Sequence, residues 1–182
     1  TLVIPELVHR LVGEGITLTN AVKIVSKTVA YTNHTILVEA LEKWPLKYLD
    51  RVLPVALIEI IKHLDSVAKS KFSSPELTII DKNRVVHMAH MCIHFSFSVN
   101  GVAALHTEIL KNNELKSFNE IYPSKFNNKT NGITFRRWLL QSNPELKSYL
   151  ESLVGEGIVK DSMKLEKLLE FRNDKDVLTK LD

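Results

Sequence analysis

Apolar residues recur at helical spacing through most of this chain, and this spacing constrains the fold more than any other feature. The clearest case runs from residue 54 to about residue 69, where the apolar positions are Leu57, Ile60, Ile61, Leu64, Val67 and Ala68. Positions three and four apart lie on one face of a helix. The same argument predicts helices at 5–12, from a cap at Thr19, at 134–140, at 144–154 and from 161 onward. The sequence therefore predicts a mainly α-helical structure.

Residues 84–97 show a different pattern, a nearly continuous apolar run between the turn-forming residues 81–83 and Asn100-Gly101. Such a run is typical of a mostly buried strand. Asn100 is a good N-cap for a helix that would follow. Residues 122–134 are rich in asparagine, lysine and proline, so we expect a long loop there. We expect one or two short strands in all, with the strand at 84–97 left as an exposed edge.

The charge balance excludes several classes of function. The 24 Lys and Arg residues nearly balance 21 Asp and Glu residues, so the net charge is only +3. The bases and aromatics at 125–138 could stack on a nucleic acid, but no clustered basic face supports that function. No apolar run approaches the roughly 20 residues of a membrane span. Cys92 is the only cysteine. We expect a cytoplasmic protein with no nucleic-acid or membrane partner.

His90, Cys92 and His94 would share one face of the predicted strand, and imidazole and thiolate are common metal ligands. Neighbouring positions on one face of a strand lie nearly 7 Å apart, so three of them rarely converge on one ion. We therefore favour structural histidines that are hydrogen-bonded, and we expect no metal.

Four short segments, taken in order, resemble the α-glucan phosphorylases, the family of the glycogen, starch and maltodextrin enzymes. They are YTNHT at 31–35, EALEKWP at 39–45, VNGVA at 99–103 and NKTNGIT at 128–134. Residues 2–11 and Arg136-Arg137-Trp138 also fit, so the resemblance covers most of the chain. The chain begins at Thr1 without methionine, and we expect it to be a piece of a longer protein.

The resemblance implies an enzyme that uses orthophosphate to release terminal α-1,4-glucosyl units as glucose 1-phosphate, with pyridoxal phosphate as its cofactor. It implies a two-domain glycosyltransferase fold of the GT-B type, built from two Rossmann-like domains. Residues 1–140 would end the N-terminal domain, and residues 141–182 would be the helical segment that leads out of it. No segment resembles the cofactor-lysine or phosphate-binding motifs. We therefore expect no catalytic residue and no bound cofactor here, and an inactive isolated chain.

By position in the matching segments, four residues would form one wall of a glucosyl pocket. His34 and Asn131 would hydrogen-bond the 6-hydroxyl of the sugar, while Gly101 and Val102 would pack against its ring. Trp138 would lie near the cofactor. Without the resemblance, each has a structural alternative: a buried histidine at 34, a left-handed turn at Asn131, and core packing for Val102 and Trp138.

The chain departs from the family pattern at three phenylalanines. Phe95 and Phe97 stand within the FSFS of 95–98, where the family usually has Gly-Ser-His-Ala, and Phe135 replaces a proline. Phenylalanine in place of glycine cannot easily adopt a positive φ. We expect a homodimer formed through exposed apolar surface or a strand edge. The alternative function is a helical protein-interaction module without catalysis.

Overall fold

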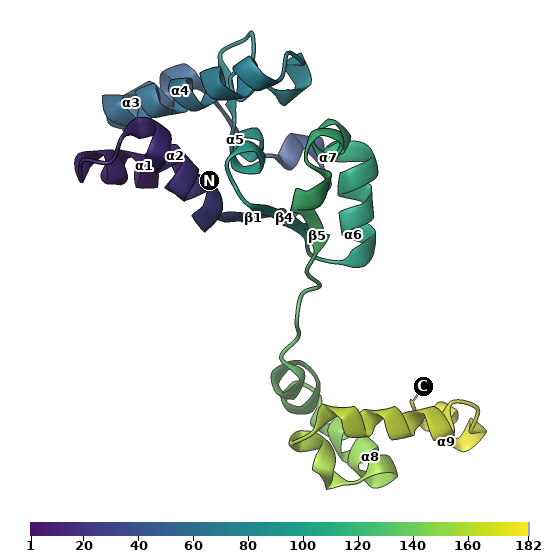
Figure 1. The fold of residues 1–182 in the computed structure, drawn as a ribbon. Helices are drawn as coiled ribbons and strands as arrows, with labels where there is room; N and C mark the ends of the chain where they lie inside the picture. Colours follow the sequence, from purple (N-terminus) through teal and green to yellow (C-terminus); the bar gives the residue numbers. More distant parts are fainter. Residues whose placement is uncertain (182) are drawn as a thin grey trace. The chain divides into compact units, whose positions relative to one another are not determined.

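The computed structural model describes residues 1–181, and these divide into two compact units (Figure 1). Unit 1 is Thr1–Asn131, and unit 2 comprises the residues from Gly132 onward. Each unit has its own buried apolar core. No helix among residues 1–181 is long and apolar enough to cross a membrane.

Four helices form one part of unit 1: α1 (Val3–Gly13), α2 (Leu18–Thr28), α3 (Leu46–Val52) and α4 (Val55–Lys71). Their apolar stripes meet in a core that includes Val8, Val25, Ile61 and Leu64, all fully buried. The helices predicted at 5–12 and 54–69 are confirmed. The predicted cap is wrong, because α2 already begins at Leu18 and Thr19 lies inside its first turn.

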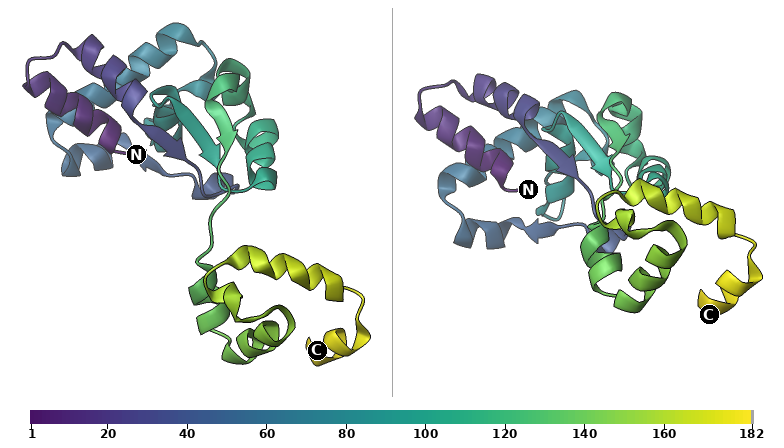
Figure 2. Two further views of the ribbon diagram at one scale, coloured as in Figure 1. Left: turned by 60° about the horizontal axis from the view of Figure 1, so that its bottom comes forward. Right: turned by 90° about the horizontal axis from the view of Figure 1, so that it is seen from below.

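The centre of unit 1 is a parallel sheet of three short strands: β1 (Ala30–Thr32), β4 (Ser98–Gly101) and β5 (Phe126–Asn128). The order is β1-β4-β5, so β4 lies between the other two (Figure 2). Asn100 is opposite both Thr32 and Asn127. A separate antiparallel pair joins β2 (Lys43–Pro45) to β3 (Val85–His87). The fold is mainly helical as predicted, but it contains more than the one or two strands expected.

The long strand predicted at 84–97 is wrong. Only Val85–His87 is extended, and Met88–His94 forms the helix α5. Every α5 residue except His90 is buried. A helix that is apolar on all sides shows no period of 3.6, so its sequence cannot be distinguished from that of a buried strand. Phe95 ends α5 at φ −112° and is 6% exposed, so this position does not require glycine.

Two other predictions in unit 1 need correction. Asn100 does not cap a helix, because it lies inside β4, and α6 (Ala104–Ile109) begins four residues later. A π-helical turn at Leu110–Glu114 then leads into α7 (Lys116–Ile121). The segment at 122–134 is only partly a loop, since it contains a 3-10 turn at Pro123–Lys125 and the strand β5. Further 3-10 turns lie at Val38–Ala40 and Pro75–Leu77.

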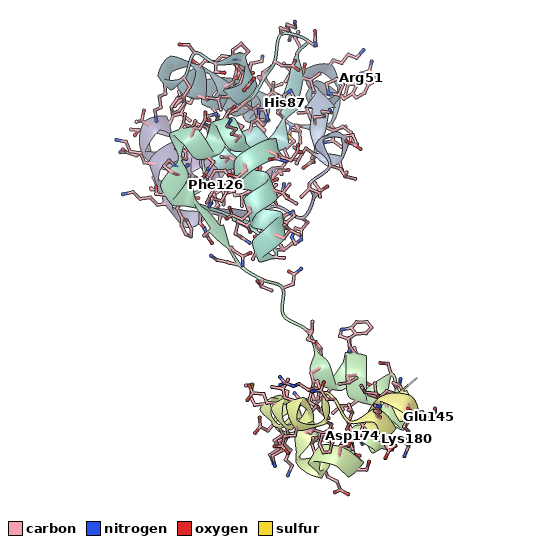
Figure 3. The ribbon with its side chains drawn as sticks, turned by 90° about the vertical axis from the view of Figure 1, so that its right-hand side faces the viewer. Arg51, His87, Phe126, Glu145, Asp174 and Lys180 are labelled. Atoms are coloured by element: carbon pink, nitrogen blue, oxygen red, sulfur yellow. The ribbon has the colours of Figure 1, made fainter. Side chains whose placement is uncertain are left out.

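Unit 2 is helical within the part that the structure describes. It contains a π-helical segment (Arg136–Gln141), α8 (Pro144–Val154), 3-10 segments (Glu156–Val159 and Ser162–Phe171) and α9 (Lys175–Leu181). The helices expected at 134–140, at 144–154 and after 161 are confirmed in position. Asn143 caps α8, because its Oδ1 accepts the Leu146 N–H at 3.0 Å. Lys180, labelled in Figure 3, lies 4.4 Å from the centre of the Tyr149 ring.

Candidate functional site

The three parallel strands of unit 1 bring the expected sugar-binding residues to one edge. His34 follows β1 by two residues, Gly101 ends β4 and is followed by Val102, and Asn131 follows β5 by three residues. Parallel strands end at the same edge, which is visible where the three arrows point in Figure 2. In open α/β sheets this carboxyl edge is where ligands bind. The fold therefore gathers all four residues at a position suited to binding.

Backbone hydrogen bonds extend the pairing beyond the strands and fix the loops of this edge. The Asn33 N–H donates to the Asn100 carbonyl oxygen at 2.9 Å. On the other side, the Asn131 N–H donates to the Val102 carbonyl oxygen at 3.0 Å. The backbones that carry His34 and Asn131 are thus held on either side of Gly101 and Val102.

The side chains of His34 and Asn131 are exposed, and no hydrogen bond between residues 1–181 engages either of them. Within that range Arg84 is the only non-glycine residue with positive φ. The structural alternatives for these two residues, a buried histidine and a left-handed asparagine, are therefore wrong. Asn33 is buried instead, and its Oδ1 accepts the Thr35 N–H at 2.9 Å, which makes the tight turn that carries His34.

Gly101 is packed against the start of α6. A Cβ at this position would lie 2.4 Å from the Thr107 Oγ1, 2.7 Å from the His106 Nδ1 and 2.9 Å from the Thr107 Cα. The backbone of Gly101 is therefore in close contact with helix α6. This places a steric requirement for glycine at the end of β4.

The sequence did not reveal His106 as part of this edge. Its Nδ1 accepts the Val102 N–H at 3.2 Å, so the neutral ring carries its proton on Nε2. That Nε2 is buried and has no hydrogen-bond partner among residues 1–181. The one feature of the sequence that could have indicated this role is the position of His106. It follows Val102 by about one helical turn, on a helix that begins beside the expected pocket.

A chain of amide and hydroxyl groups along the strands also escaped prediction. Asn100 Oδ1 accepts the Thr32 hydroxyl at 2.8 Å, and Asn100 Nδ2 donates to the Gly101 carbonyl at 2.8 Å. Asn127 Nδ2 donates to the Ser98 hydroxyl at 2.8 Å. These bonds satisfy the polar side chains of a sheet that has few apolar residues.

Trp138 belongs to unit 2, whereas the four residues expected to bind the sugar belong to unit 1. Its side chain is 68% exposed on the helical segment Arg136–Gln141. The backbone N–H of Trp138 donates to the Thr134 carbonyl oxygen at 2.9 Å, and this hydrogen bond forms the start of that segment. The alternative of core packing for this tryptophan is therefore wrong.

The histidines of α5 are hydrogen-bonded to backbone carbonyls. His90 Nδ1 donates to the Thr78 carbonyl at 2.8 Å, and His94 Nε2 donates to the Leu77 carbonyl at 2.7 Å. Burial lowers the pKa of His90 to about 4 and raises the pKa of the Cys92 thiol to about 11. No three His, Cys, Asp or Glu side chains within residues 1–181 are grouped so as to hold a metal ion.

Comparison with known proteins agrees with the resemblance. The family model described as carbohydrate phosphorylase matches residues 1–182. A maltodextrin phosphorylase of Streptococcus pneumoniae is 55% identical over the whole chain, which covers 24% of that protein. The liver glycogen phosphorylase of Bos taurus is 43% identical over 96% of the chain and 22% of its own length. The brain form of Rattus norvegicus is 44% identical over 94% of the chain and 22% of its own length.

The chain therefore spans less than a quarter of the length of these relatives. Since the family model matches every residue, the resemblance found in the four sequence segments is confirmed. The chain belongs to the carbohydrate phosphorylase family.

Proposed function

We propose that this chain forms one wall of the glucosyl pocket of an α-glucan phosphorylase. The whole enzyme would use orthophosphate to release glucose 1-phosphate from the ends of α-1,4-glucans such as maltodextrin or glycogen, in the cytoplasm. His34 and Asn131 would hydrogen-bond the sugar, while Gly101 and Val102 would contact its ring. Residues 1–140 would belong to a Rossmann-like N-terminal domain of a GT-B fold, and residues 141–182 would lead out of it.

The observation that carries this proposal is the meeting of these four residues at the carboxyl edge of the sheet β1-β4-β5. They come from three segments that are far apart in sequence, and two of them present polar side chains that residues 1–181 leave unused. Exposed donors and acceptors on a fixed backbone are what a sugar-binding wall requires.

The resemblance places one residue of this chain near pyridoxal phosphate. Trp138, the only residue expected near that cofactor, has a ring that is 68% exposed and lies in unit 2. We propose that the cofactor is held mainly by other parts of the longer protein, and that the isolated chain is inactive. We assign no chemical step to the residues of this chain.

The test is an assay of the protein at its full natural length for orthophosphate-dependent release of glucose 1-phosphate from maltodextrin. We expect His34→Ala and Asn131→Ala each to lower kcat/KM about tenfold, the value of one net hydrogen bond to the sugar. His9→Ala, which changes a half-exposed site of α1, should leave the rate unchanged. A wild-type protein that releases no glucose 1-phosphate would overturn the activity. An active wild type with unaffected variants would overturn the site.

A homodimer is the partner that we propose for the whole protein. The segment expected to supply a free strand edge, residues 84–97, contains the helix Met88–His94 and only a short strand, Val85–His87, which pairs with β2, so it does not supply that edge. Among residues 1–181, β1 and β5 end the three-stranded sheet, and Val52 and Val55 are 75% and 76% exposed. Sedimentation of the full-length protein as a monomer would contradict the proposal.

The competing function is a protein-interaction module without catalysis. The same assay of glucose 1-phosphate release distinguishes the two functions.

A further inference from the structure

A groove of about 540 Å³ lies in unit 1, between α2, α4 and the end of α5, away from the four residues of the sugar site. On α2 its lining follows one helical stripe that includes Val22, Lys23 and Lys27. On α4 the lining residues His63, Val67 and Lys71 are spaced four apart. Such spacing places each set on one face of its helix. The volume falls in the range of small-molecule sites.

The groove is lined by positive charges and by no carboxylate. Lys23, Lys27, Lys71 and Lys125 all line it, and no Asp or Glu does. None of these four lysines takes part in an ion pair among residues 1–181. By contrast, Lys62 and Lys69 on other parts of α4 pair with Glu59 and Asp65 at 2.8 and 2.6 Å.

Lys125 is fixed at the inner end of the groove without a carboxylate. Its Nζ donates to the Ile93 and His94 carbonyls at 2.8 and 2.9 Å and lies 4.1 Å from the centre of the Tyr122 ring. An ammonium group has three donors, so one remains. Burial, together with the charge of Lys71, lowers the pKa of Lys125 to about 8. A bound anion would relieve this repulsion.

The floor of the groove is apolar. Val22 and Val67 are half-buried, and Phe95 is 6% exposed. Phe95 is one of the three departures from the family pattern, so the sugar site does not account for it. A ligand that matches these walls has a flat apolar body and an anionic head with several acceptors. Phosphate oxygens suit the lysine ammonium groups of this groove.

We propose that the groove between α2 and α4 binds an organic phosphate monoester, with its phosphate held by Lys27, Lys71 and Lys125 and its body lying over Phe95. This site shares no residue with the proposed sugar pocket and does not depend on it. The competing explanation is that these lysines only stabilise helix ends, because Lys27 and Lys71 lie in the last turns of α2 and α4.

The experiment is a calorimetric titration of the chain with phenyl phosphate, inorganic phosphate and phenol. We expect saturable binding of phenyl phosphate, weaker binding of inorganic phosphate and none of phenol. The double variant Lys27→Gln/Lys71→Gln should weaken phenyl phosphate binding about tenfold or more, since charge-assisted hydrogen bonds are lost. The matched control is Lys62→Gln/Lys111→Gln, which removes two cations that already pair with glutamates. It should change the affinity less than about twofold.

Three results would overturn the proposal. Equal weakening by the control variant would show non-specific attraction to positive charge. Binding of phenol as tight as that of phenyl phosphate would show an apolar pocket without anion recognition. A lower Tm of the Lys27→Gln/Lys71→Gln variant with unchanged affinity would show that the lysines act only on the helix ends.

Discussion

At the scale of single residues, Gly101 shows how tightly β4 is joined to α6. The Cα of Thr107 would lie 2.9 Å from an added Cβ, and this backbone atom cannot move without shifting the helix. We expect Gly101→Ala to lower the free energy of unfolding by about 1–3 kcal/mol, as overpacking does. Urea unfolding followed by circular dichroism measures this change.

Gly13→Ala is the matched control for Gly101→Ala. It lies at the end of α1 with no atom within 4 Å of an added Cβ, and alanine favours helix. The control should be neutral or slightly stabilising. Similar stability of the two variants would contradict the close packing of β4 on α6.

His90 makes the stability of unit 1 depend on pH. The ring is surrounded by His87 at 4.6 Å, Phe118 at 4.8 Å and the Thr78 carbonyl, and burial is the main cause that lowers its pKa to about 4. The unfolded chain binds a proton near pH 6.5. The stability due to neutral His90 is therefore complete above about pH 6.5 and is lost as the pH falls to about 4.

Between pH 6.5 and 4 we expect the free energy of unfolding to fall by about 3 kcal/mol, since one pKa unit corresponds to about 1.36 kcal/mol. His90→Phe removes this titration, so thermal unfolding of the variant should depend less steeply on pH between 6.5 and 4 than that of the wild type. His9→Phe, at a half-exposed site of α1, controls for the loss of one histidine. Parallel curves for His90→Phe and the wild type would contradict the buried neutral ring.

At the scale of elements, the sequence predicted those helices whose apolar stripe faces one core. α4 and α8 fall where the period of 3.6 places them. The sequence pattern did not predict α5, because a helix that is buried on all sides has no single apolar stripe. It also did not predict β1, β4 and β5, because three or four residues are too few to show an alternation of apolar and polar side chains. Those short strands are held by pairing between distant segments, which no local pattern records.

The candidate site was predicted only through the family resemblance. Nothing in the local sequence of His34 or Asn131 indicates that both lie at one edge of the sheet. The order β1-β4-β5 depends on pairing between distant residues: Thr32 lies opposite Asn100, and Asn100 lies opposite Asn127. His106 was missed for the same reason. Its role is visible only when Val102 and α6 are placed together.

Asp65 joins α4 to the segment that precedes β3. Its buried carboxylate accepts the Ile79 and Ile80 N–H groups at 3.1 and 2.9 Å and pairs with Lys69 at 2.6 Å. Asp65→Ala would leave two buried N–H groups without acceptors, so we expect a loss of about 2–4 kcal/mol. Glu59→Ala on the same helix removes only an exposed pair with Lys62 and should change stability by less than about 1 kcal/mol. Equal urea midpoints for the two variants would contradict the anchoring role.

At the scale of the whole molecule, the two units have separate cores. Every buried residue of the two clusters in unit 1 precedes residue 132, and the cluster of unit 2 is built from Leu140, Leu150, Val154 and Ile158. Residues 129–134, which contain the boundary between the units, are exposed and lie outside any helix or strand. A segment of this kind is a preferred site of proteolysis.

Brief digestion with proteinase K should therefore cut first within residues 132–134, which follow the last backbone hydrogen bond of this segment to unit 1, from the Asn131 N–H to the Val102 carbonyl. Residues 82–84 are also exposed, but the Asp81 Oδ1 accepts the Asn83 and Val85 N–H groups, each at 2.9 Å, and these bonds hold the turn closed. Mass spectrometry identifies the first cut, and circular dichroism should show that the larger product keeps its helices, because its core is complete without unit 2. A first cut at 81–84 would contradict the predicted cleavage site. Loss of helix on cleavage at the boundary would show that the cores of the two units are not independent.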